Sequence, residues 1–140
     1  MMWMHTDHAM DGLLENYDWY GKEFIGPDEV HPLVFSSGNS GRTYRVNPAL
    51  MPIGLALHMP FLKRPIMRYF FKLGKPLFST KKTGARLRMT EHRGKSSATM
   101  CYDALPIHDV FRKFDENTLL GLMDMKGMEQ PFFFILRRVI

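Results

Sequence analysis

The residues best suited to chemistry in this sequence are carboxylates and histidines near the ends of predicted strands. They occur as Glu91-His92 and His108-Asp109, with Asp103 between them in the chain. A carboxylate and an imidazole in contact can act as general base and general acid. Neighbouring residues of a strand point to opposite faces, so neither dipeptide is a working pair by itself. Cross-strand contact would be needed, and structural hydrogen bonding to turns is the alternative. The candidate catalytic residues, if the protein is an enzyme, are His92, Asp103, His108 and Asp109.

A second kind of chemistry is the binding of a polar head group by charges inside an apolar environment. Asp124 lies between Met123 and Met125 in an otherwise apolar predicted strand, and buried carboxylates are rare unless they are paired. Arg86 or Arg88 on a neighbouring strand is the predicted partner. Facing the interior, Arg88 and Asp124 would form a polar anchor for a ligand. The alternative places Asp124 on a solvated outer face.

The elements that must position these residues are short strands separated by turn residues. Regular alternation and closely spaced turns are typical of an antiparallel sandwich or barrel. The last third of the chain contains five predicted strands: Ala85–His92, Ser96–Asp103, His108–Phe114, Thr118–Met125 and Pro131–Val139. Three more are predicted earlier: Tyr20–Ile25, Val30–Ser36 and Gly41–Val46.

The remaining segments have helical character. Asp11 is a candidate cap for a short helix before residue 19. Prolines divide residues 48–80, where Pro52–Met59 and Pro65–Lys72 each resemble a helix with Pro in its first turn. In the second helix we expect Ile66, Met67, Phe70 and Phe71 to form one apolar face. We therefore predict one domain over 1–140. Its parts are an N-terminal segment (1–19), a first strand block (20–46), a helical insert or lid (48–80) and a C-terminal strand block (84–139).

Composition is that of a globular protein of 140 residues, with 45% hydrophobic and 24% charged residues. Twelve Met and eleven Phe are an excess, and Met recurs at adaptable apolar binding surfaces as well as in cores. A single Cys fits a reducing compartment. The sequence has no signal-peptide pattern and no apolar run long enough for a transmembrane helix. We expect a cytoplasmic protein.

The net charge of +5 comes from one region. Residues 61–88 hold nine basic residues and no acidic one, so the rest of the chain carries a net negative charge. Three interpretations remain open: a solvated helix face, an anionic membrane surface, and nucleic acid. Nucleic acid is disfavoured because the aromatic residues here have the spacing of helix burial rather than of stacking platforms.

Metal and cofactor motifs are weak or missing in this sequence. His5, Asp7 and His8 are close together near the chain end without a fixed third histidine, so we expect no metal site there. A Gly-rich phosphate loop, a Gly-X-Ser-X-Gly elbow and a Cys-X-X-Cys pair are not found. We expect no cofactor.

One set of segments carries a resemblance to a known family: Met10–Glu15, Trp19–Lys22, His31–Leu33, Ala85–Arg88, Glu91–Gly94, Tyr102-Asp103, Asp109–Arg112, Asp115–Gly127 and Phe132–Arg138. Together they resemble a family that pairs an N-terminal Gly-X-Trp-X-Gly signature with a C-terminal domain of unknown function. Trp3 has no flanking glycines, so we expect the signature strand itself to be missing. Barrel closure would then depend on a partner chain or on the N-terminal segment. The resemblance implies a lipocalin-like or fatty-acid-binding-protein-like small barrel with an apolar ligand. It spans about residues 5–138.

Together these observations predict a mainly β protein, a small or half-open antiparallel barrel, that binds an apolar or amphiphilic small molecule. The alternatives are an isomerase, cyclase or hydratase that uses the same cavity, and an interaction module that pairs with another chain, including a homo-oligomer. Besides Arg88 and Asp124, the predicted ligand-binding residues are Trp19, Tyr44, Met89, Met100, Tyr102, Met123 and Phe133.

Overall fold

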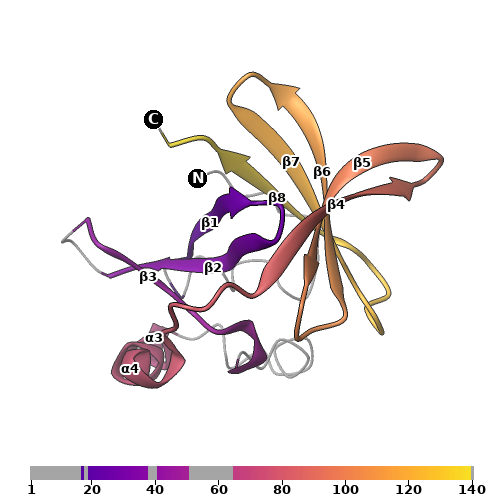
Figure 1. The fold of residues 1–140 in the computed structure, drawn as a ribbon. Helices are drawn as coiled ribbons and strands as arrows, with labels where there is room; N and C mark the ends of the chain where they lie inside the picture. The colour runs from indigo at the N-terminus through magenta and orange to yellow at the C-terminus, as the bar shows by residue number, and fades with distance from the viewer. Residues whose placement is uncertain (1–16, 18, 38–40, 51–64, 140) are drawn as a thin grey trace.

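The computed structural model describes residues 17, 19–37, 41–50 and 65–139, and its main element is one antiparallel sheet (Figure 1). The strands are β1 (Trp19–Gly26), β2 (Glu29–Ser36), β3 (Thr43–Arg45), β4 (Ala85–His92), β5 (Lys95–Tyr102), β6 (Ile107–Asp115), β7 (Thr118–Met125) and β8 (Phe132–Arg137). The helical elements of the described ranges are η2 (Pro48–Leu50), α3 (Pro65–Leu73) and α4 (Lys75–Phe78).

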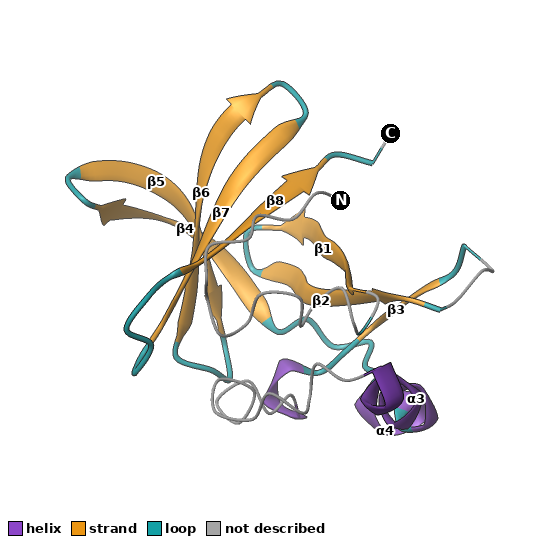
Figure 2. Ribbon diagram, turned by 180° about the vertical axis from the view of Figure 1, so that it is seen from behind, coloured by secondary structure: helices purple, strands orange, loops and turns teal. Residues whose placement is uncertain are grey.

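The strands follow the order β1-β2-β4-β5-β6-β7-β8, and β3 pairs with β2. Every pairing is antiparallel, and the sheet curls into a nearly closed barrel (Figure 2). Within the described strands, β1 and β8 end this order without pairing to each other. Side chains bridge these two edges, because the ring centroids of Trp19 and Phe134 are 5.7 Å apart. The predicted fold class, a mainly β antiparallel barrel, is confirmed.

The predicted strands agree with the observed ones to within two residues at each end. Alternating hydrophobicity and turn residues are local signals in the sequence. Short hairpin connections also fix where one strand ends and the next begins. The second predicted helix is α3, and α4 extends the helical region beyond it. The helices predicted before residue 19 and at Pro52–Met59 lie outside the described residues.

The predicted apolar face of α3 is wrong in one respect. Met67 and Phe71 pack against the core, whereas Ile66 and Phe70 are each 60% exposed. Successive helix residues are about 100° apart around the axis, so a pair one position earlier points well away from the Met67–Phe71 contact. The ring of Phe71 lies against those of Phe35 and Phe78, at 5.1 and 5.5 Å between centroids.

The core is built from side chains that face each other across strands. Met100, Asp109, Met123 and Phe132 are successive cross-strand neighbours on β5, β6, β7 and β8, and all four are buried. The next row contains Gly121 and its β8 partner Phe134. The Phe134 ring occupies the space that a side chain at Gly121 would fill. A glycine is therefore needed at this position for the ring to lie flat on β7.

Candidate functional site

An irregular strand brings Lys22 into the barrel interior. In β1 the register with β2 shifts between Trp19 and Gly21, and again between Gly21 and Glu23. Such bulges re-aim the side chains that follow them. Trp19 and Lys22 are three residues apart and would face opposite sides of a regular strand. Here both side chains lie inside, with Lys22 Nζ 5.3 Å from the centre of the Trp19 ring.

Lys22 forms a buried ion pair with Asp109 of β6. Its Nζ is 2.7 Å from Asp109 Oδ2, and the side chains are 2% and 1% exposed. Lys22 also donates to the backbone oxygen of Pro32 at 3.2 Å. Burying both charges carries a desolvation penalty that only good geometry offsets. The buried Lys22–Asp109 pair is therefore the candidate functional site of the barrel.

Aromatic rings surround the ammonium group of Lys22. Besides the Trp19 ring, Tyr102 of β5 and Phe134 of β8 have ring centres 5.6 and 5.2 Å from Nζ. The negative faces of aromatic rings attract a cation, and the attraction is stronger where water is excluded. The three rings therefore compensate part of the lost hydration of Lys22.

Among the described residues, one oxygen of Asp109 has no hydrogen-bond partner. Oδ1 is buried and accepts no hydrogen bond from any described residue. Burial raises the pKa of the Asp109 carboxyl, and the charge and hydrogen bond of Lys22 oppose this rise. Burial, with the charge of Asp109, raises the pKa of Tyr102 well above its usual range. Chemically, Asp109 can accept a hydrogen bond from a ligand or exchange a proton with it.

The predicted polar anchor, Arg88 with Asp124, is wrong. Arg88 lies outside the barrel and its Nη2 is 2.7 Å from Asp28 Oδ1. Asp124 is exposed and lies opposite His108 of β6. Because Met123 faces the interior, alternation points its neighbour Asp124 outward. Arg86 was the alternative predicted partner of Asp124. Its Nη1 instead lies 2.6 Å from Asp103 Oδ1.

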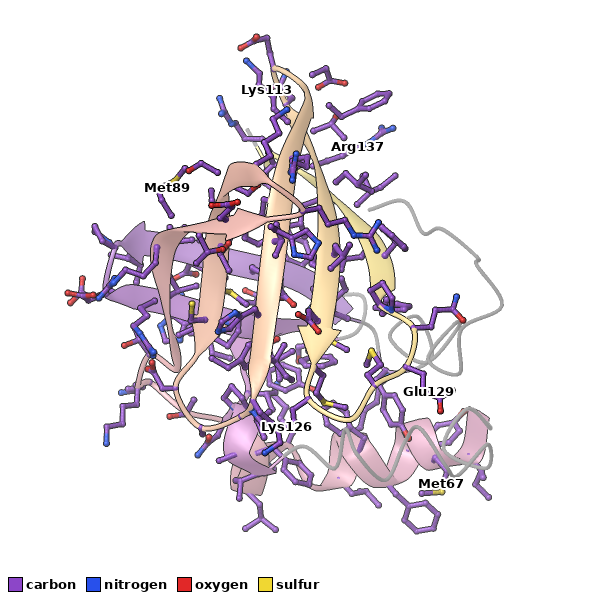
Figure 3. All side chains as sticks on the ribbon, turned by 90° about the vertical axis from the view of Figure 1, so that its right-hand side faces the viewer. Met67, Met89, Lys113, Lys126, Glu129 and Arg137 are labelled. Atoms are coloured by element: carbon purple, nitrogen blue, oxygen red, sulfur yellow. The ribbon has the colours of Figure 1, made fainter. Side chains whose placement is uncertain are left out.

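The apolar candidates fall into two groups. Met89 is 67% exposed. It lies on the β4–β5 hairpin (Figure 3), which extends beyond the barrel (Figure 1). Phe133 is partly exposed and alternates with the buried Phe132 and Phe134, so it belongs to the other face of β8. These two residues do not join the Lys22–Asp109 pair. The other candidates are buried in the core: Trp19, Tyr44, Met100, Tyr102 and Met123.

The four acid–base candidates do not form one site. Asp109 is inside the barrel, while Asp103 and His108 are exposed. His92 pairs with Lys95 at the far end of the β4–β5 hairpin. On β5, the partner of His92 (Lys95) and the partner of Asp109 (Met100) are five residues apart. This separation corresponds to about 16 Å. The structure thus separates the predicted His–Asp partners and gives Asp109 a lysine instead.

Lys22 was not predicted as a site residue. Strand alternation in the segment Trp19-Tyr20-Gly21-Lys22 assigns Lys22 to the face opposite Trp19, and the bulge reverses this. An isolated glycine inside a strand pattern indicates a bulge or a close backbone approach. Gly21 was therefore the available signal.

Two protein-family models match the chain. The model described as GXWXG protein matches residues 2–39, and the model described as Domain of unknown function (DUF4334) matches residues 83–138. The chain therefore carries the predicted pairing of these two domains. The predicted absence of the signature needs correction, because Trp19-Tyr20-Gly21 supplies its Trp-X-Gly part and Tyr17 stands where the first glycine would be. This segment begins β1, the strand that carries Lys22.

A solved structure has a similar fold. The crystal structure of a protein from Thermomonospora curvata superposes with a TM-score of 0.68 at 29% sequence identity, and the match covers 99% of this chain and 70% of that one. No curated protein matches the chain. The described helices include none long and apolar enough to cross a membrane.

Proposed function

We propose that the barrel interior binds an apolar or amphiphilic small molecule whose polar group meets the Lys22–Asp109 pair. The observation that carries this proposal is the buried Asp109 Oδ1, which has no hydrogen-bond partner in the described part of the chain. Buried polar atoms in folded proteins are nearly always hydrogen-bonded. A ligand that donates to this oxygen would complete the site.

The surroundings favour a ligand with an apolar body. Met100 and Met123 are the cross-strand neighbours of Asp109, and Phe132 lies next to Met123. Thioether side chains adapt to different apolar shapes. Because an ionised carboxylate accepts hydrogen bonds, the matching ligand group is a hydroxyl or N–H donor. Lipid-like or terpenoid-like alcohols have this combination, and α3 with α4 would serve as the lid at one end.

The first test is native mass spectrometry of the purified protein. We expect a co-purified adduct of lipid size on the monomer. Binding is then measured by tryptophan fluorescence with 1-dodecanol as the probe, where we expect micromolar-class affinity, about −8 kcal/mol. Dodecyl methyl ether is the matched probe without an O–H donor, and we expect it to bind about tenfold more weakly because Oδ1 stays unpaired.

Variants locate the site. Met123→Asp places an unpaired charge beside Asp109 in the interior and should abolish binding. Lys126→Ala, at an exposed turn position, is the control and should bind as the wild type does. No adduct and no saturable binding of either probe would refute ligand binding. Equal affinity for the alcohol and the ether would refute Asp109 as the anchor.

An enzyme is the second candidate function, and the raised pKa of Asp109 favours it. A carboxyl whose pKa moves toward neutral pH transfers protons more effectively in both directions. Asp109 would act as general acid or base on a bound apolar substrate, as in an isomerase, cyclase or hydratase, with Lys22 as its neighbouring cation. Ligand extracted from the protein and incubated with fresh enzyme should change in structure with the wild type and stay unchanged with Asp109→Asn.

A further inference from the structure

Helix α3 has a second apolar stripe that faces away from the barrel. It consists of Ile66, Tyr69, Phe70 and Leu73, spaced at i, i+3, i+4 and i+7, which places them on one side of a helix. They are 60%, 67%, 60% and 79% exposed. Met67 and Phe71 occupy the opposite side and pack against the core. Leu77 of α4 is also 79% exposed.

The chain segment that contains this stripe carries only positive charges. Residues 30–90 contain eleven Lys and Arg residues and no Asp or Glu. Three of the arginines, Arg45, Arg86 and Arg88, are paired with acidic residues from outside this range. Near the helices, Lys72 lies in α3, and Lys81 and Lys82 follow α4 with exposed side chains. Neither Lys81 nor Lys82 forms an ion pair with a described residue.

We propose that α3 and α4 dock on the surface of an anionic lipid bilayer, with the exposed stripe in the interface and the lysines on the head groups. Amphipathic helices bind membranes in this way, through buried apolar area and attraction to anionic lipids. At nine residues α3 is too short to cross a bilayer, so it lies along the interface.

Charge argues for lipid rather than for a second copy of the chain. A symmetric dimer through this stripe would bring two lysine-rich surfaces together, which costs binding energy. An anionic bilayer supplies both the apolar layer and the opposite charge. The position of the helices is also compatible with membrane docking, because they form one end of the molecule. Met67 of α3 marks this end, and Lys113 on the β6–β7 hairpin marks the other (Figure 3).

The experiment is flotation of the full chain with phosphatidylcholine vesicles, prepared with and without phosphatidylserine. We expect binding to the serine-containing vesicles and its loss at high salt, because screening weakens the attraction. The variant Lys81→Gln/Lys82→Gln should lower the apparent affinity about fivefold for each lysine removed.

The apolar stripe is tested with Tyr69→Gln/Leu73→Gln, which should reduce vesicle binding roughly tenfold or more. The matched control is Met89→Gln/Phe114→Gln, which alters equally exposed side chains, 67% and 78%, on the two hairpins away from the helices. The control should bind vesicles as the wild type does. Circular dichroism and the thermal midpoint confirm that both variants are folded.

Three outcomes would overturn the proposal. Equal binding to vesicles with and without phosphatidylserine would show that charge does not contribute to binding. An unchanged vesicle affinity of Tyr69→Gln/Leu73→Gln would show that the stripe does not contact the membrane. A lipid-free dimer in light scattering that this variant converts to monomer would assign the stripe to a second copy of the chain.

Discussion

Lys22 Nζ lies 2.7 Å from Asp109 Oδ2, although their strands are not neighbours in the sheet. Lys22 belongs to β1 at one end of the strand order and Asp109 to β6 near the other. The contact therefore crosses the inside of the barrel and joins the two parts of the chain that match different family models. An ion pair in this place ties β1 to the strands it does not hydrogen-bond.

Removing one member of this pair should destabilise the fold strongly. Lys22→Met leaves the carboxylate of Asp109 buried without its counter-charge. Breaking a buried pair in this way costs about 3–5 kcal/mol. We expect losses of this size in the free energy of unfolding, measured by urea denaturation at neutral pH.

The double variant Lys22→Met/Asp109→Leu is the control for this prediction. It removes both charges and keeps the interior filled with apolar groups, so its stability should be close to that of the wild type. A double variant as unstable as Lys22→Met would show that packing rather than charge explains the loss.

The pH dependence of stability should show the effect of burial on Asp109. Its pKa in the folded state is raised by burial above the unfolded value of about 3.9. The folded state therefore holds this proton to higher pH than the unfolded chain does. The stabilisation is fully present below about pH 3.9 and is lost as the pH rises through the folded-state pKa.

Asparagine does not titrate, so comparison with Asp109→Asn isolates this effect. The difference in the free energy of unfolding, wild type minus variant, should decrease as pH rises from about 4 to 7. Urea denaturation at several pH values measures it. An increase over this range would mean that Lys22 dominates and lowers the Asp109 pKa.

The strands were predictable because their signals are local. The alternation in Ala85–His92 and the turn at Arg93-Gly94 describe the β4–β5 hairpin without any knowledge of the rest of the chain. The inward position of Met123 also follows from alternation. For its neighbour Asp124 the sequence left two interpretations, a buried anchor and a solvated outer face, and the alternation selects the outer face.

The site was only half predictable. Asp109 was among the acid–base candidates because of its residue type, but its partner depends on the bulge in β1 and on a contact between strands far apart in the chain. Register irregularities follow from three-dimensional packing, which residue spacing does not record. The exposed side of α3 was missed for a related reason, since the sequence cannot say which side of a helix meets the sheet.

Gly121→Ala should destabilise the barrel. The added methyl group would overlap the ring of Phe134 on the neighbouring strand, and overpacking of this kind costs about 1–3 kcal/mol. Gly26→Ala is the control, because the nearest atom to its added methyl group is a Glu29 side-chain oxygen at an ordinary 3.8 Å. Thermal and urea denaturation of both variants measure the effect. Equal stability of the two variants would mean that Phe134 moves away from Gly121 without cost.

Tyr102 should stay protonated in the folded protein above the pH at which a free tyrosine ionises. Burial raises its pKa well above the usual value of about 10, and the charge of Asp109 adds to the rise. Ionisation is thus easier in the unfolded chain, so the contribution of Tyr102 to stability is complete below pH 10 and decreases above it. Phenolate absorbance of the wild type and of Tyr102→Phe should therefore agree just above pH 10 while both are folded. On addition of denaturant the wild type should gain the absorbance of one more phenolate, and a difference already visible in the folded proteins would place Tyr102 in contact with solvent.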